Sequence, residues 1–201
     1  MPEYAPGTPS WVELSSPDTD AAAGFYGELM GWRATEPGGA QTGGYRMFQQ
    51  DGKNVAGLMG HMREGQPTAW ATYVSVANAN ANADETAAKV RAAGGTVVLE
   101  PMDVMDIGRM AFFADPTGAV FGAWQPKSFT GADLVNEPNS LCWNEVLTRA
   151  PDQGRELLGC LAPPSGKPAE RRDYPRRGPS VNAGPAALRQ PRGGEPGSPR
   201  W

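Results

Sequence analysis

The feature that most constrains the fold of this chain is an internal duplication. A strand, a helix and further strands follow one another from residue 8, and the same order begins again at "WATYVSVA", residues 70–77. Two βαβββ units, each roughly 55–60 residues long, thereby fill residues 8–126. Because each unit has a single helix and several consecutive strands, the sequence predicts an α+β domain built from two packed copies.

The first unit opens with a strand that has two different faces. In "SWVELS", alternation places Trp11, Glu13 and Ser15 on one face and Val12 and Leu14 on the other. The pattern predicts a strand with one wholly apolar face and one face that carries a carboxylate.

A helix and a hairpin follow in the same unit. Asp18 is placed to accept hydrogen bonds from the first helical turn, and Gly31 ends the helix. "GYRMFQQ" and "NVAGLMG" are predicted strands joined at Asp51-Gly52, the strongest hairpin signal in the chain. The spacing i, i+3, i+4, i+7 predicts an apolar stripe that packs on the sheet, formed by Ala22, Phe25, Tyr26 and Leu29.

The second unit repeats this plan. "ADETAAKVRAAGG" predicts a helix that ends at Gly94-Gly95 and has one face formed by Ala83, Thr86, Ala87 and Val90. "TVVLEPMDV", "GRMAFFAD" and "AVFGAWQP" supply strands, and Asp115 is expected to cap the turn between the last two.

The pattern weakens beyond residue 126. Residues 127–139 are predicted as a linker, and "CWNEVLTRAPD" then resembles "SWVELSSPD", so residues 140–159 are predicted to start a second, incomplete module. Residues 160–201 are dominated by Pro, Gly and Arg, with too little apolar surface to offset the entropy of ordering. A disordered C-terminal tail is therefore expected.

Charge separates the tail from the rest of the chain. Residues 1–160 carry 10 Lys and Arg against 19 Asp and Glu, whereas residues 161–201 carry 8 against 3. Two interpretations of this basic tail remain open: an appendage that binds acidic partners, or an out-of-frame reading of a GC-rich gene. The abrupt failure of the third repeat in mid-helix favours the second.

Composition also limits location and chemistry. No stretch approaches the roughly 18 consecutive apolar residues of a membrane span, and "MPEYAPGTPS" lacks the features of a secretory signal. Cys142 and Cys160 are too few for a disulfide framework, and motifs for nucleotide phosphates, HExxH and CxxC are absent. We therefore expect a cytoplasmic protein without a membrane or nucleic-acid partner.

Several motifs together resemble the vicinal oxygen chelate superfamily, which includes glyoxalase I, extradiol dioxygenases and bleomycin-resistance proteins. They are the paired βαβββ units, the helix end "FYGELMGW" and the hairpin "DPTGAVFGAW". The "WxEL" strand and the later "WNEVLTR" look like actinobacterial two-module members, some of which are linked to polyketide antibiotic pathways. The resemblance implies a cupped mixed sheet with helices outside, over residues 8–126.

Members of that superfamily hold a divalent metal with His, Gln or Glu at four inward positions. The resemblance places these positions on Trp11, on Ala56 or Gly57, on Ala71 or its neighbour Trp70, and on Gly122. None of these side chains offers the imidazole nitrogen or carboxylate oxygen that such metals bind. We therefore expect neither a metal nor another cofactor, and the lone His61 is expected to be a solvated loop residue.

Small and aromatic residues at these positions predict a ligand pocket with flat apolar walls, because aromatic rings give large contact areas. The alternative is that the aromatic side chains simply fill the cup. Glu13 is either a general base or ligand contact or a structural group, and Arg109 either pairs with Glu13, holds a ligand oxygen or lies exposed. Trp70 is a further candidate for the wall, and the predicted pocket consists of Trp11, Glu13, Ala71, Tyr73, Arg109, Gly122 and Trp124.

The predicted function is metal-free binding of a small hydrophobic or aromatic metabolite by an accessory or resistance protein of antibiotic biosynthesis. The alternative is a glyoxalase-like lyase, isomerase or oxygenase (hydroxylase) that uses Glu13 or a metal completed by another chain. An incomplete second module would leave apolar surface uncovered, which predicts either a homodimer or aggregation.

Overall fold

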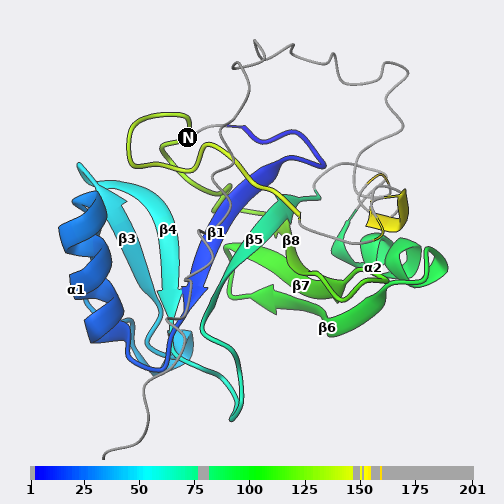
Figure 1. Ribbon diagram of the computed structural model, residues 1–201, viewed down its shortest axis with the longest axis horizontal. Coiled ribbons are helices and arrows are strands. Elements are labelled where there is room, and N and C mark those ends of the chain that lie inside the picture. The colour runs from blue at the N-terminus through cyan, green and yellow to red at the C-terminus, as the bar shows by residue number, and fades with distance from the viewer. Residues whose placement is uncertain (1–2, 77–81, 147–149, 151, 155–158, 160–201) are drawn as a thin grey trace, which may run out of the picture. The chain divides into compact units, whose positions relative to one another are not determined.

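The computed structural model describes residues 3–76, 82–146, 150, 152–154 and 159, all of which lie in the compact unit Met1–Ser165. Eight strands form one mixed sheet in the order β2-β3-β4-β1-β5-β8-β7-β6 (Figure 1). The predicted α+β class and the paired units are confirmed. The predicted tail, residues 160–201, lies outside the described residues.

The first unit contains β1 Pro9–Ser15, α1 Thr19–Met30, β2 Arg33–Ala34, the short 3₁₀ helix Ala40–Thr42, β3 Arg46–Gln50 and β4 Lys53–Met59. Asp18 caps α1 by accepting a hydrogen bond from the Ala21 amide at 2.8 Å, and Gly31 ends it in the left-handed region. Asp51 and Gly52 both have positive φ, as the predicted hairpin turn requires. The two-residue strand β2 was not predicted.

The second unit contains β5 Ala69–Ser75, α2 Ala83–Ala92, β6 Thr96–Val104, β7 Gly108–Ala114 and β8 Val120–Pro126. Asp115 closes the turn before β8, where its Oδ1 accepts hydrogen bonds from the Thr117 and Ala119 amides. This confirms the predicted capping role of Asp115.

The two units join through one antiparallel strand pair. β1 and β5 lie side by side in the middle of the sheet, with Trp11 opposite Tyr73 and Glu13 opposite Ala71. Each of these strands also has a parallel neighbour on its other side, β4 for β1 and β8 for β5. The centre of the sheet therefore has an approximate twofold relation between the two units.

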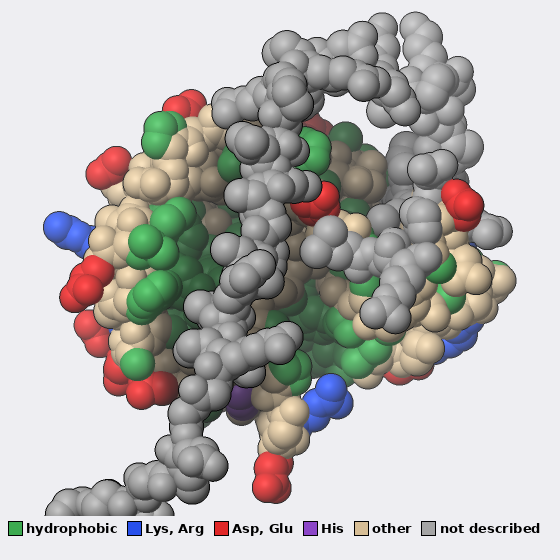
Figure 2. All heavy atoms as spheres, viewed as in Figure 1, with side chains coloured by type: hydrophobic (Ala, Val, Ile, Leu, Met, Phe, Trp, Pro, Cys, Tyr) green, Lys and Arg blue, Asp and Glu red, His purple; other side chains and the backbone are tan. Residues whose placement is uncertain are grey.

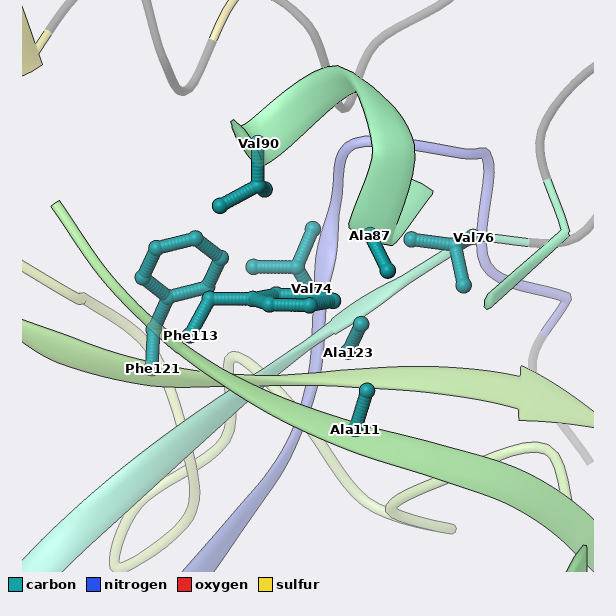
Figure 3. Packing of buried hydrophobic residues seen from close by; sticks show 8 residues of the cluster. All are labelled: Val74, Val76, Ala87, Val90, Ala111, Phe113, Phe121 and Ala123. Carbon is teal, nitrogen blue, oxygen red and sulfur yellow. The ribbon is translucent and has the colours of Figure 1, made fainter. Parts of the chain in front are cut away.

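Each helix packs on one face of its own half of the sheet (Figure 1). Below α2, Ala87 and Val90 contact Val74, Phe113 and Phe121 in a closed apolar cluster (Figure 3). The predicted buried face of α2 is confirmed for Ala83, Thr86, Ala87 and Val90.

The predicted buried face of α1 is partly wrong. Phe25 and Leu29 are 59% and 61% exposed, whereas Tyr26 packs against Trp32 and Phe48 with ring centroids 6.0 and 5.8 Å apart. The helix is rotated so that Ala22, Tyr26 and Met30 face the sheet. Periodicity gives the spacing of a stripe, but the bulk of the surrounding rings decides which stripe is buried.

Residues 127–141 form a segment that crosses both units (yellow-green in Figure 1); we call it the closing segment. It contains residues 127–139, which were expected as a linker. The amides of Lys127 and Phe129 donate to the Ile107 carbonyl beside β7. Further along, the amide of Ala132 donates to Ser10 of β1 at 2.9 Å, and that of Asp133 donates to Asn54 of β4 at 2.8 Å. The segment therefore ties the ends of both halves together.

Glycine is required where this segment passes β1. Gly131 has φ of 134°, and a Cβ at this position would lie 2.3 Å from the Ser10 carbonyl oxygen. Farther along, the Trp32 indole donates to the carbonyl of Asn139 at 2.8 Å, which anchors the end of the segment beside α1.

We predict that the closing segment contributes to domain stability. A chain ending at Gln125 is expected to unfold with a free energy about 3 kcal/mol or more below that of a chain ending at Val146, because several hydrogen bonds and the burial of Phe129 and Leu134 are lost. Urea unfolding of the two chains measures the difference. Equal unfolding free energies would show that the segment is a dispensable linker.

Candidate functional site

The candidate site is the sheet face opposite α1 and α2, here called the concave face. Strand alternation and register place on it a row of residues from four adjacent strands: Glu13, Trp11, Gly57, Ala71, Tyr73 and Gly122. Five of the predicted pocket residues are among them, and Trp124 joins the same apolar cluster as Trp11 and Tyr73.

Glu13 lies at the centre of a hydrogen-bonded group. The Tyr73 hydroxyl donates to Glu13 Oε1 at 3.1 Å, and the Trp11 indole donates to the Tyr45 hydroxyl at 3.0 Å. Tyr45 also acts on the Glu13 carboxyl as a hydrogen-bond partner. These four residues, Trp11, Glu13, Tyr45 and Tyr73, are called the Glu13 network.

Burial dominates the electrostatics of this network. Glu13 is 7% exposed, and loss of solvent raises the pKa of its carboxyl, although hydrogen bonds from Tyr45 and Tyr73 act in the opposite direction. Burial and the nearby Glu13 carboxyl also raise the pKa values of Tyr45 and Tyr73 well above the ordinary value, so both phenols stay protonated donors.

Two glycines make room for the tyrosine side chains. A Cβ at Gly57 would lie 2.0 Å from the Tyr45 hydroxyl oxygen, and one at Gly122 would lie 2.4 Å from Cδ1 of Tyr73. Both distances are far below van der Waals contact. Each tyrosine therefore occupies the space that any side chain at the facing glycine would enter.

The contacts at these glycines also bear on whether the divalent metal implied by the family resemblance fits this face. Ala56 packs in the core on the α1 side, so Gly57 is the β4 position on the concave face. Trp11, Gly57, Ala71 and Gly122 offer no metal-binding atom, and in the part of the chain that is described no three His, Cys, Asp or Glu side chains cluster. The residues present do not suit a divalent metal site.

One end of the concave face is closed by aromatic packing. The Phe129 ring meets Trp11 edge-on at 5.0 Å between centroids and lies 5.9 Å from Trp124, whose indole donates to the Phe129 carbonyl at 2.7 Å. Trp11 and Trp124 are 4% and 6% exposed. These two tryptophans are therefore buried between the sheet and the closing segment.

The other part of the face keeps accessible apolar surface. Ala71, Met47, Met110 and Phe112 are partly exposed, and Phe112 packs edge-on against Tyr73 at 5.1 Å. On the side of the molecule seen in Figure 2, acidic side chains lie mostly toward the edges and hydrophobic side chains gather between them. The aromatic residues thus fill one end of the face and leave the other apolar.

Three sequence candidates lie away from the network. Arg109 donates to the Asp84 carboxylate at 3.0 Å and to Asp103 at 3.3 Å, so its guanidinium pairs with those residues and not with Glu13. Trp70 packs beside α1, where its indole donates to the Tyr26 hydroxyl at 2.8 Å. His61 lies in a loop near the Thr68 hydroxyl.

Tyr45 and Phe129 are the site residues that sequence reasoning missed. Alternation in "GYRMFQQ" places Tyr45 on the same face as Met47, which pairs with Gly57, so a signal for Tyr45 was present. Phe129 had no such signal, because it belongs to an irregular segment whose path is set by distant carbonyls.

The raised pKa of Glu13 predicts a pH-dependent stability. The folded chain binds this proton more tightly than the unfolded chain, whose Glu13 has the ordinary pKa of 4.5. The stabilisation is complete below pH 4.5 and is lost as the pH rises through the raised pKa. Replacing Glu13 with neutral Gln should remove this loss of stability at higher pH.

Urea unfolding at intervals from pH 4.5 to 8 tests this expectation. The unfolding free energy of Glu13→Gln should fall less with rising pH than that of the unchanged protein. Glu64→Gln, at an exposed loop position, is the control and should follow the unchanged protein. Parallel curves for the unchanged protein and Glu13→Gln would contradict the raised pKa.

None of the helices in the described part of the chain has the length and hydropathy of a membrane span.

Known proteins resemble this chain over its folded part. The anthracycline biosynthesis proteins DauV of Streptomyces sp. (strain C5) and DnrV of Streptomyces peucetius are each 40% identical to it over 162 residues. Each match covers 74% of this chain and 58% of the relative, so the chain spans less than two thirds of their length. The Mn(II)-bound glyoxalase from Novosphingobium aromaticivorans is 19% identical, with a TM-score of 0.48 over 78% of this chain and 53% of that one.

A family model matches more than half of the chain. It covers residues 8–122, which contain the whole Glu13 network and both βαβββ units up to the first residues of β8, and it describes the glyoxalase/bleomycin resistance protein/dioxygenase superfamily. The chain belongs to this superfamily.

Proposed function

We propose that this protein binds a small hydrophobic or aromatic metabolite on its concave face without a metal ion. One observation carries the proposal: tyrosine side chains occupy the space at Gly57 and Gly122 from which metal-binding carboxylates would project. The partly exposed Met47, Met110 and Phe112 provide an apolar surface for such a ligand.

We assign this binding to an accessory or resistance role in the biosynthesis of an antibiotic of the polyketide type. The relatives DauV and DnrV, named as anthracycline biosynthesis proteins, support the pathway class. Because this chain spans 58% of their length, the role of the whole relative is a proposal for this chain. We also propose a cytoplasmic homodimer without a nucleic-acid partner.

A glyoxalase- or hydroxylase-like enzyme acting on such a metabolite is the second candidate. The observation that favours it is a buried carboxyl with a raised pKa between two phenols, since perturbed groups of this kind often act in acid–base catalysis. Glu13 would then transfer a proton to or from the bound ligand.

Equilibrium binding to a panel of polycyclic aromatic compounds tests the first proposal. At least one compound is expected to bind more tightly than about 1 mM, measured by calorimetry. Ala71→Leu, which adds bulk at a partly exposed position beside Glu13, should weaken that binding roughly tenfold or more, because the added side chain fills the ligand's space.

Thr72→Val is the matched control, since Thr72 is the next residue on β5 and points to the opposite face. It should leave the affinity unchanged. Metal analysis of the purified protein completes the test: stoichiometric, tightly held Mn, Fe, Ni or Zn would contradict metal-free binding, and so would the failure of every compound to bind below about 1 mM.

The enzyme candidate makes its own prediction. If the protein turns over a member of the panel, Glu13→Gln should lower kcat by about 10²–10⁴-fold, the usual contribution of a general acid or base. Its pH–rate profile should also lose one ionisation. A folded Glu13→Gln variant with unchanged turnover would rule out Glu13 as the proton-transferring group.

A further inference from the structure

Only small side chains flank the buried Glu13 on the side away from Trp11. Its register neighbours on β4 and β5 are Gly57 and Ala71, and the next residue on the same face of β1 is Ser15. All three side chains are small, and those of Ala71 and Ser15 are partly exposed. The closed end, by contrast, lies on the Trp11 side, where Phe129 packs.

In the Glu13 network the carboxyl accepts hydrogen bonds and both phenols donate to it. The Tyr73 hydroxyl donates to Glu13, and the Trp11 N–H donates to the Tyr45 oxygen, which leaves the Tyr45 hydrogen for its other partner, Glu13. A carboxylate has about four lone-pair positions on its two oxygens, so two phenols do not exhaust them. The Glu13 carboxylate can therefore accept a further hydrogen bond from a ligand.

The side chains around the carboxyl favour a neutral donor. Apart from the two phenols and Ser15, whose hydroxyl accepts a hydrogen bond from the Gln66 side-chain amide at 2.6 Å, the residues around the network on this face are apolar, namely Trp11, Ala71 and Phe112. A second carboxylate placed here would be repelled by Glu13. A charged ammonium group would be attracted by Glu13 but would lose its hydration, with few other polar groups to replace it. A neutral hydroxyl on a planar ring can donate a hydrogen bond to the Glu13 carboxyl while the ring packs against the apolar side chains.

We propose that Glu13 selects planar hydroxyaryl ligands by accepting a hydrogen bond from a ring hydroxyl, while Tyr45 and Tyr73 hold the carboxyl in position. This inference rests on the proposed function and names the ligand class for the same face. The competing explanation is that the Glu13 network only stabilises the fold, in which case a ring hydroxyl would bring no gain in affinity.

A matched pair of probes separates these explanations. We would measure the binding of 2-naphthol and 2-methoxynaphthalene at pH 8 by calorimetry, because the two compounds share the ring system and the second lacks the donor. The unchanged protein is expected to bind 2-naphthol about tenfold or more tightly than the ether, the usual value of a hydrogen bond to a charged group. 2-Naphthoate should bind more weakly than 2-naphthol.

Glu13→Gln is expected to reduce the preference to within about twofold, because the two phenols would hold the amide oxygen and turn its N–H toward the ligand. Thr72→Val, on the opposite face of β5, should keep the full preference. Thermal unfolding of each variant establishes that it is folded.

Each outcome decides the proposal. Equal affinities of the unchanged protein for naphthol and its ether, which need no variant to observe, would overturn the inference and leave the proposed binding function in place. A hydroxyl preference that survives in folded Glu13→Gln would likewise overturn it. If neither probe nor any compound of the panel binds below about 1 mM, both proposals fail together.

Discussion

The close approach of two tyrosines to glycine backbone determines the character of the concave face. Tyr45 and Tyr73 reach their positions only because Gly57 and Gly122 have no Cβ. From there their hydroxyls reach Glu13, so the absence of two side chains creates a buried carboxyl with phenol partners. A polar group buried this deeply is tolerated because its hydrogen bonds replace those it made to water.

The closing segment adds a second constraint, because it limits the space on the concave face. Phe129 fills the end of the face beside Trp11 and Trp124, and hydrogen bonds to Ser10 and Asn54 hold the segment across both units. At this end of the face the aromatic side chains therefore fill the cup, as one of the two alternatives raised by the sequence expects, whereas the ligand pocket remains a proposal. The small residues Ala71 and Ser15, both partly exposed, lie on the side of Glu13 away from this packing.

The sequence predicted the elements of this fold better than the site. Duplication, alternation and turn residues were sufficient to place α2 and every strand except the two-residue β2, because each depends on local periodicity. They failed at Phe25 and Leu29, where the rotation of α1 depends on the bulk of Trp32 and Phe48. Glu13 and Tyr73 were found by their strand faces. Tyr45 was missed although strand alternation with Met47 indicates its face, whereas Phe129 acts through contacts distant in sequence that no spacing encodes.

The approximate twofold relation explains why the network contains a single carboxyl. Glu13 pairs with Gly57 on the parallel strand β4, as Tyr73 pairs with Gly122 on β8, so Glu13 and Tyr73 occupy equivalent positions in the two units. A carboxylate at both positions would bring two like charges together in a buried site, which strongly raises the pKa of one of them. Having tyrosine at the second position replaces that repulsion by a hydrogen bond across the interface between the units. The divergence of the two copies at this one pair of positions thus makes a buried acid compatible with a stable fold.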